Sequence, residues 1–163
     1  MSDLKSEVLA NFGNRLRVRV CGFLIEEEKV LMVKHKMITK EGVFWAPPGG
    51  GLDYGESTEA ALKREFLEET GLEIEIVKFL CTHEFLAPPL HGIELFFLVK
   101  RKNGNLVKGN DPELGNQQIL EEVTFLSFDE VKNLPINSFH NLFNHCNTLE
   151  EVIHLNGLYQ YIP

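Results

Sequence analysis

Hydrophobic and polar residues alternate strictly over residues 15–20, which read RLRVRV. A period of two predicts a half-buried strand in which Leu16, Val18 and Val20 face inward and the arginines face solvent. The strand continues through CGFLI, after which a charged turn, EEEK, leads into a second apolar run, VLMV. Two apolar runs joined by a short polar turn predict a β-hairpin.

A segment rich in proline and glycine, FWAPPGGG, precedes the clearest helical pattern of the chain. Its consecutive prolines and glycines exclude a helix or a central strand there, so we expect a loop. Ser57 or Thr58 can cap the start of a helix, and Gly71 can end one. Residues 57–70 are therefore predicted to be helical.

Further apolar runs predict strands at LEIEIVKFL, around THEFL, at IELFFLVKR and at EEVTFLSF. A short helix is expected over FDEVKNLP, which Pro135 ends, and the polar residues 103–118 are expected to form a long loop. The tail, residues 137–163, is predicted to be partly helical, with a short strand near residues 159–162. Several strands with one firm internal helix and helices near the end predict a mixed α/β sandwich, built as a single domain over residues 1–163.

Composition and charge restrict the class of protein. The 163 residues carry a net charge of −8, which makes the chain a poor binder of nucleic-acid backbones. No apolar run approaches the length that spans a membrane, and the N-terminus lacks an apolar signal core, so we expect a cytoplasmic protein. Cys21, Cys81 and Cys146 lie far apart without a CxxC pair, which predicts reduced, buried thiols rather than a disulfide framework or a zinc site.

Three glutamates crowd one face of the predicted helix. Glu65, Glu68 and Glu69 are three and four residues apart, so their side chains converge, while Leu62 and Phe66 are expected to face the core. Like charges at this spacing repel one another, and a bound cation reverses the sign of that interaction. Clustered oxygen ligands favour Mg²⁺, with Mn²⁺ as a substitute. Taken alone, the cluster is more typical of a solvated acidic surface than of a metal site.

The surrounding sequence favours a metal site over a solvated acidic surface. Residues 50–72, GGLDYGESTEAALKREFLEETGL, resemble the Nudix box, G-x5-E-x7-R-E-U-x-E-E-x-G-U, in which U is a bulky apolar residue. Every fixed position matches, with Phe66 and Leu72 at the U positions. Pro47 departs from the usual entry to the box, where an aliphatic residue is more common. The resemblance implies the Nudix α/β/α sandwich, with a mixed sheet and a catalytic loop–helix–loop.

The resemblance also implies an activity, the metal-dependent hydrolysis of a nucleoside diphosphate linked to another group. Metal ions neutralise the phosphate oxygens and lower the pKa of a bound water. Arg64 is expected to hold a glutamate in place by a charge-assisted hydrogen bond. The implied metal ligands are Glu65, Glu68 and Glu69, with Glu56 in support, directly or through water, and the backbone carbonyl of Gly50.

The general base is less sharply defined by the sequence. One of the helix glutamates can serve. In many relatives a later acid near a late strand completes the site, and Glu122, just ahead of VTFLSF, is our candidate. Glu121 and Glu113 follow it in order of preference.

Basic and aromatic residues are expected to meet the rest of the substrate. The arginines of the first strand and the basic residues before the box are candidates for phosphate contacts, although a solvated strand face explains the arginines equally well. Phe44 and Trp45 are candidates for stacking on a base, with a buried core aromatic as the alternative. The basic candidates are Arg15, Arg17, Arg19, Lys34, His35, Lys36 and Lys40.

A short region after the box bears on the substrate. Pro88 lies sixteen residues beyond Leu72 and is followed by Pro89, which resembles the ADP-ribose branch of the family. The stretch APPLHGIELFF also resembles that branch, with Glu94 at its acidic position, although Pro-Leu replaces Pro-Gly. ADP-ribose or a related ADP-sugar is thus the implied substrate, and a (deoxy)nucleoside triphosphate is the alternative, because the same region is similar to the sanitising branch.

Two hypotheses from other classes remain open at this point. Some proteins of this fold sense a nucleotide without cleaving it, although such members typically lose box acids that this chain keeps. An interaction domain with a merely acidic helix is the other. Family members are often dimers, so a homodimer is a further expectation, and aromatic residues of the tail are candidates for its interface.

Overall fold

The first two strands form a β-hairpin, as the alternating pattern predicts. The computed structural model describes residues 6, 9–36, 42–110 and 119–163. Strand β1 (Arg15–Glu26) pairs antiparallel with β2 (Lys29–Lys36). Glu27 and Glu28 form the turn with φ angles of 48° and 58°, the left-handed conformation that matches the twist of a two-residue hairpin.

The strands form one mixed sheet in the order β3-β2-β1-β6-β5-β8, with β4 paired to β1 and β7 paired to β2. Strand β6 runs parallel to β1, and β8 runs parallel to β5, so the tail closes one edge of the sheet. The remaining strands are β3 (Val43–Ala46), β4 (Gly49–Gly51), β5 (Glu73–Ala87), β6 (Leu90–Asn103), β7 (Leu120–Ser127) and β8 (Leu158–Tyr161).

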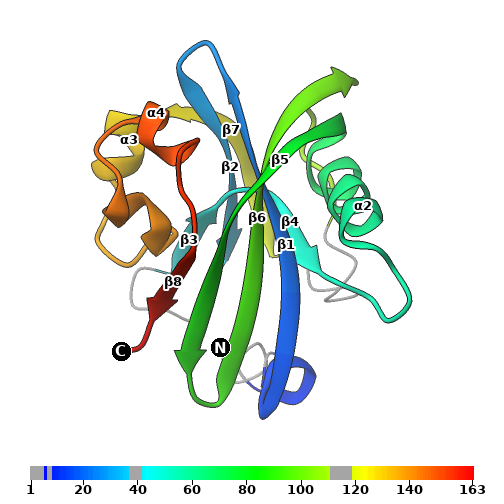
Figure 1. The fold of residues 1–163 in the computed structure, drawn as a ribbon, viewed down its shortest axis with the longest axis vertical. Helices are drawn as coiled ribbons and strands as arrows, with labels where there is room; N and C mark the ends of the chain where they lie inside the picture. The colour runs from blue at the N-terminus through cyan, green and yellow to red at the C-terminus, as the bar shows by residue number, and fades with distance from the viewer. Residues whose placement is uncertain (1–5, 7–8, 37–41, 111–118) are drawn as a thin grey trace.

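Helical segments cover both faces of the sheet, with α2 on one side and the C-terminal segments on the other (Figure 1). The neighbours Phe23 and Leu24 of β1 point into these two layers. Phe23 packs edge-on against Phe143, and Leu24 belongs to the same cluster as Phe66 of α2. The α/β sandwich is therefore as predicted. The segments are α2 (Thr58–Thr70), α3 (Phe128–Lys132), the 3-10 helix η2 (Asn141–His145) and α4 (Leu149–Val152).

The start of β1 is oriented opposite to the prediction. Val20 is buried as expected, but Leu16 and Val18 are exposed, by 58% and 36%. Arg17 and Arg19 instead line a cavity. The alternation is correct, but its direction is wrong at Leu16 and Val18, because the face that carries Arg17 and Arg19 lines the cavity.

The predicted loop between β2 and α2 contains two short strands, β3 and β4. The loop expectation is wrong for Gly49–Gly51, which form a short strand paired with Arg19–Cys21. The exclusion of a central strand holds there, because β1 is the single partner of β4 among the strands of the described residues. The two runs LEIEIVKFL and THEFL also form one long strand, β5, with register shifts along it. None of the helices in the described part of the chain has the length and apolarity needed to cross a membrane.

Candidate active site

Caps and core contacts fix the position of α2. The Ser57 side chain accepts a hydrogen bond from the Ala60 N–H at 3.2 Å, and Gly71, with a φ of 71°, ends the helix in the left-handed conformation. Leu62 and Phe66 are fully buried against the sheet. Glu65 and Glu69 lie beside them on the buried side of the helix, and Glu65 is thereby directed toward Gly50 of β4.

Arg64 connects acids of the helix and of the loop before it. Its guanidinium donates to Glu56 at 2.9 and 3.0 Å, to Glu65 at 2.8 Å and to Glu68 at 3.2 Å. It also donates to the Gly51 carbonyl at 3.1 Å, which ties helix and loop together. Hydrogen bonding to Glu56 raises the pKa of Arg64, and the same contact lowers the pKa of Glu56. The structure thus places three glutamates, rather than one, around this arginine.

Glu65 and Glu69 are buried, with 3% and 2% of their surface exposed. Glu69 accepts a hydrogen bond from the Gly49 N–H at 3.0 Å, and the His35 ring nitrogen Nε2 lies 3.3 Å from its other oxygen. The Gly50 backbone approaches Glu65 so closely that no side chain fits there. Burying two carboxylates side by side is unfavourable unless charge compensates them.

This donor set fits a hard divalent cation. Carboxylate oxygens and a backbone carbonyl are the ligands that Mg²⁺ and Mn²⁺ take in proteins. Glu65, Glu68, Glu69 and Glu56, with the Gly50 carbonyl, are the residues that would hold it.

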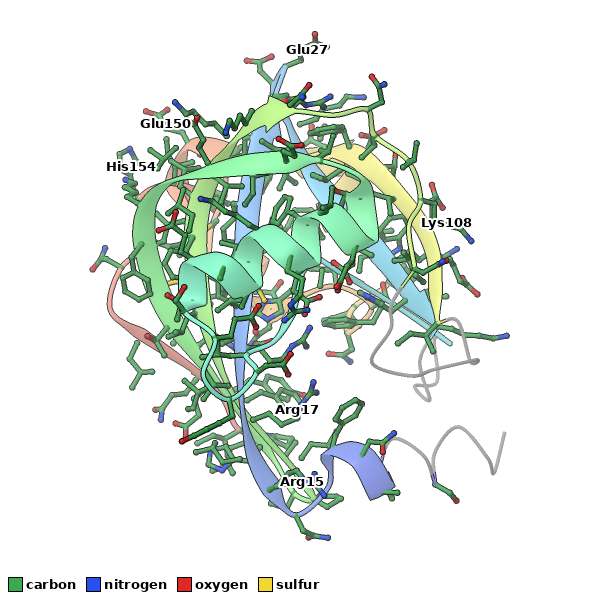
Figure 2. All side chains as sticks on the ribbon, turned by 90° about the vertical axis from the view of Figure 1, so that its right-hand side faces the viewer. Arg15, Arg17, Glu27, Lys108, Glu150 and His154 are labelled. Atoms are coloured by element: carbon green, nitrogen blue, oxygen red, sulfur yellow. The ribbon has the colours of Figure 1, made fainter. Side chains whose placement is uncertain are left out.

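A cavity of about 710 Å³ extends from these carboxylates along the sheet. Glu65, Glu69, Gly50 and His35 line one part of it. Arg17, another lining residue, lies near the start of β1, away from α2 (Figure 2). Further lining residues come from the N-terminal segment, the sheet and the tail, among them Phe12, Arg19, Phe85, Gly92, Glu94, His140 and Tyr161.

A buried polar cluster lies in the wall of this cavity. His83 Nδ1 and His140 Nε2 lie 2.7 and 2.9 Å from the same Glu94 oxygen, and Arg19 lies 3.6 Å from the other. Burial alone would raise the pKa of Glu94, but His140, His83 and Arg19 outweigh it and hold that pKa well below its usual value. Both rings therefore donate to an ionised carboxylate.

Three residues of this cluster, His83, Glu94 and His140, have the composition of a metal site, since their ligand atoms lie within 4.8 Å of one another. However, His140 Nδ1 accepts the Leu142 N–H at 3.3 Å, which places the ring proton on Nε2, the atom that a metal would need. The hydrogen bonds to Glu94 explain these contacts without an ion, whereas His83 Nε2 is buried and has no hydrogen-bond partner among the described residues. Glu94 was predictable from the sequence, but its histidine partners were not, because only the pairing of distant strands and the path of the tail bring them together.

Other predicted residues lie outside the cavity lining. Lys34 pairs with Glu121 at 3.5 Å, and Glu122 is exposed on β7 opposite Lys34.

Trp45 is 93% buried in the core rather than presented to a ligand, so the alternative that it is a core aromatic holds. Pro88 and Pro89 form the turn between β5 and β6, next to lining residues Ala87 and Leu90. Two candidates, Lys40 and Glu113, lie outside the described residues.

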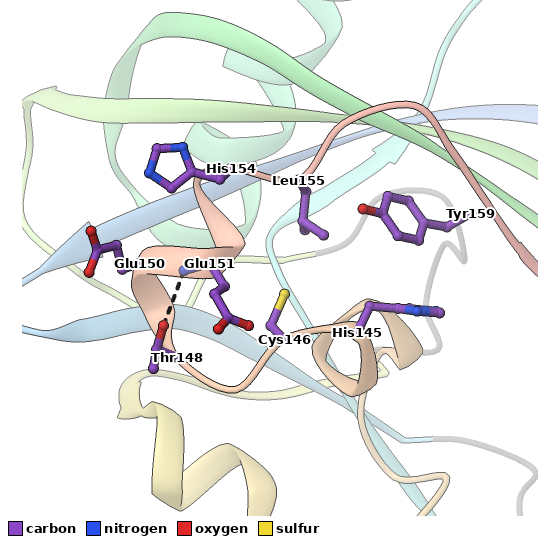
Figure 3. A pocket seen from close by; sticks show the side chains of 8 residues that line it. All are labelled: His145, Cys146, Thr148, Glu150, Glu151, His154, Leu155 and Tyr159. Carbon is purple, nitrogen blue, oxygen red and sulfur yellow. Dashed lines mark hydrogen bonds between the residues drawn. The ribbon is translucent and has the colours of Figure 1, made fainter.

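A second pocket, of about 530 Å³, lies within the tail, remote in sequence from the box (Figure 3). Its lining includes Glu151, whose N–H is bonded to the Thr148 hydroxyl at 3.2 Å in the cap of α4. That contact is structural, and the pocket shares only His145 with the lining of the larger cavity.

Comparisons with known proteins agree with this geometry. The family model described as "NUDIX domain" matches residues 15–144. An ADP-ribose pyrophosphatase of Methanocaldococcus jannaschii is 32% identical over 117 residues, which are 71% of this chain and 69% of the relative. An 8-oxo-dGTP diphosphatase of Proteus vulgaris is 33% identical over 85 residues, 51% of this chain and 74% of the relative.

A solved structure shares the fold. The MutT NUDIX hydrolase from Burkholderia pseudomallei superposes with a TM-score of 0.64 at 23% identity, covering 80% of this chain and 95% of its own. At this sequence identity, the similarity shows a shared fold and nothing about the activity of this chain.

Proposed function

Because the chain belongs to the Nudix hydrolase family, we propose that it hydrolyses the pyrophosphate bond of ADP-ribose or a related ADP-sugar. Water would add to one phosphorus, and the bridging oxygen would leave with the other phosphate, giving AMP and a sugar phosphate. The observation that carries this proposal is the pair of buried carboxylates, Glu65 and Glu69, that line a cavity of about 710 Å³.

The residues have separate tasks. A divalent cation, when bound, supplies charge neutralisation and a water of lowered pKa. Arg64 orients Glu56, Glu65 and Glu68 through its hydrogen bonds, so the ligands are arranged before the ion arrives. Arg19 donates to the Gly49 carbonyl at 3.2 Å and lines the cavity, where a guanidinium suits a phosphate group.

A helix glutamate is the better candidate for the general base. Glu69 lines the cavity and contacts His35, whereas Glu122 is exposed and outside the lining. A base must come within hydrogen-bond reach of the water that it deprotonates. We therefore assign proton abstraction to Glu69 and keep Glu122→Gln as the variant that tests the alternative.

The archaeal relative supports an ADP-ribose substrate, since it matches 71% of the chain. A (deoxy)nucleoside triphosphate is the second candidate, favoured by the match to the Proteus diphosphatase over 51% of the chain. A sensor that binds without turnover is less well supported, because Glu56, Glu65, Glu68 and Glu69 are all present.

The experiment is a substrate panel with Mg²⁺ and Mn²⁺, in which products are identified by mass. AMP and ribose 5-phosphate from ADP-ribose, at a higher kcat/KM than any triphosphate gives, support the proposal. Loss of turnover in Glu69→Gln that persists when the metal concentration is raised until the variant is saturated, together with retained turnover in Glu122→Gln, supports the assignment of the base. Faster turnover of a triphosphate, or binding without turnover of any compound, contradicts it.

A further inference from the structure

The start of the tail is joined to strand β3 by hydrogen bonds. The Trp45 N–H donates to the Ser138 carbonyl at 2.7 Å, and the His140 N–H donates to the Trp45 carbonyl at 2.9 Å. All three residues are buried. Strand β3 ends at Ala46 and leads through two prolines to Gly49 of β4, so the tail holds the strand from which the glycine loop begins.

The His140 side chain makes a second connection to the same loop. Its Nε2 donates to the Glu94 oxygen Oε2 at 2.9 Å, and the other Glu94 oxygen lies 3.6 Å from Nη1 of Arg19. Nη2 of the same guanidinium donates to the Gly49 carbonyl at 3.2 Å. Because a guanidinium is planar and rigid, holding one of its nitrogens fixes the direction of the other.

Gly49 joins these contacts to a carboxylate of α2. Its N–H donates to Glu69 Oε2 at 3.0 Å, while its carbonyl accepts from Arg19. Glu69 is 2% exposed, so water cannot replace this hydrogen bond without a local rearrangement. A continuous set of contacts therefore runs from the tail to the acidic helix, in the order His140, Glu94, Arg19, Gly49 and Glu69.

Charge strengthens the middle of this set. Glu94 is 7% exposed, and its ionised carboxylate is in contact with His140, His83 and Arg19. Hydrogen bonds to an ionised group are about twice as strong as neutral ones, and burial strengthens them further. Loss of the His140 donor therefore removes one of the contacts that orient this carboxylate toward Arg19.

We propose that His140 is a positioning residue for the metal ligand Glu69 and acts on it through this set of contacts. The tail is thereby part of the support of the metal site, although it lies outside the box in sequence. The proposal rests on the proposed function for the role of Glu69 as a ligand.

Two substitutions at His140 separate its two side-chain contacts. Asparagine can accept the Leu142 N–H as Nδ1 does but is too short to reach Glu94, whereas glutamine places an amide N–H near the position of Nε2. His140→Asn therefore breaks the set of contacts and keeps the cap of η2, and His140→Gln keeps the contact with Glu94. Leu155→Ala, in the apolar core of the tail, is the control for a change in stability alone.

A Mn²⁺ titration without substrate measures the effect on the metal site. His140→Asn should bind Mn²⁺ about tenfold more weakly than the parent, as is usual when the support of a metal ligand is lost, while His140→Gln and Leu155→Ala keep the parent affinity. In the metal-free protein, the Gly49 amide hydrogen should lose protection from exchange in His140→Asn and keep it in the other two variants. A merely structural role would lower the melting temperature of His140→Asn and Leu155→Ala and leave both readouts unchanged.

Parent-like Mn²⁺ affinity in His140→Asn, or an equal loss in His140→Gln or Leu155→Ala, overturns the proposal. Glu94→Gln, which removes the charge that pairs with Arg19, should show the same loss, and parent-like affinity there overturns the proposal even if His140→Asn does not fold. Failure of the parent to bind Mn²⁺ would overturn the proposed function, and exchange of the Gly49 amide would then decide the positioning role. Equal protection of that amide in His140→Asn and the parent would contradict it.

Discussion

The backbone of Gly50 lies against the carboxylate of Glu65, such that a Cβ on Gly50 would be 2.4 Å from the Glu65 carboxyl carbon. No side chain can occupy that position unless Glu65 moves. Since Gly50 comes from β4 and Glu65 from the middle of α2, this contact sets the distance between the glycine loop and the acidic helix.

Gly50→Ala is expected to displace Glu65 and to lower the affinity for Mg²⁺ by about 10- to 100-fold, the usual effect of disturbing the support of a metal site. The measurement is a Mn²⁺ titration, with Tyr54→Ala, at an exposed position of the same loop, as the control. Parent-like affinity in Gly50→Ala would show that the close approach has no role in metal binding.

Arg64→Lys is expected to lower kcat by about tenfold or more, although the charge is kept, because lysine cannot donate in the fork geometry that joins Glu56, Glu65 and Glu68. Steady-state kinetics at saturating Mg²⁺ provide the measurement. Lys63→Ala, which removes only the exposed pair with Glu59, should leave kcat unchanged. Similar kcat values for Arg64→Lys and the parent would contradict this role.

Phe66→Ala should destabilise the fold by about 3–5 kcal/mol, because Phe66 is fully buried and contacts the strand beside Gly22. Leu67→Ala, next to it and 54% exposed, should change stability by less than about 1 kcal/mol. Chemical denaturation compares the two. Equal effects would mean that α2 is not anchored through this face.

Glu94→Gln should lower the melting temperature at pH 7, because a carboxylate paired with His83, His140 and Arg19 would be lost. The pKa of Glu94 is lowered on folding, so its contribution is complete above the usual value of 4.5 and is lost as the pH falls toward the folded pKa. The difference between parent and variant should therefore shrink between pH 7 and pH 3. A difference that is constant across this range contradicts the ionised state of Glu94.

The box could be found from the sequence because its spacing is set by one helix, and local periodicity brings Glu65, Glu68 and Glu69 together. The hairpin and the α/β sandwich were predictable for the same reason. The orientation of Arg17 and Arg19 was not, since alternation fixes which residues share a face and not which face meets the core. His83 and His140 lie 57 positions apart, and their meeting at Glu94 depends on strand register and on the path of the tail. Long-range pairing of this kind leaves no local pattern in the chain.

The central claim is that buried carboxylates of α2 bind a divalent cation, and Mn²⁺ binding followed by electron paramagnetic resonance tests it most directly. The titration compares the parent with Glu69→Gln and with Glu59→Gln, an exposed acid of the first turn of the same helix. We predict saturable Mn²⁺ binding to the parent and to Glu59→Gln, and an affinity at least about tenfold weaker in Glu69→Gln. Equal affinities in all three proteins, or no saturable binding to the parent, would contradict the account.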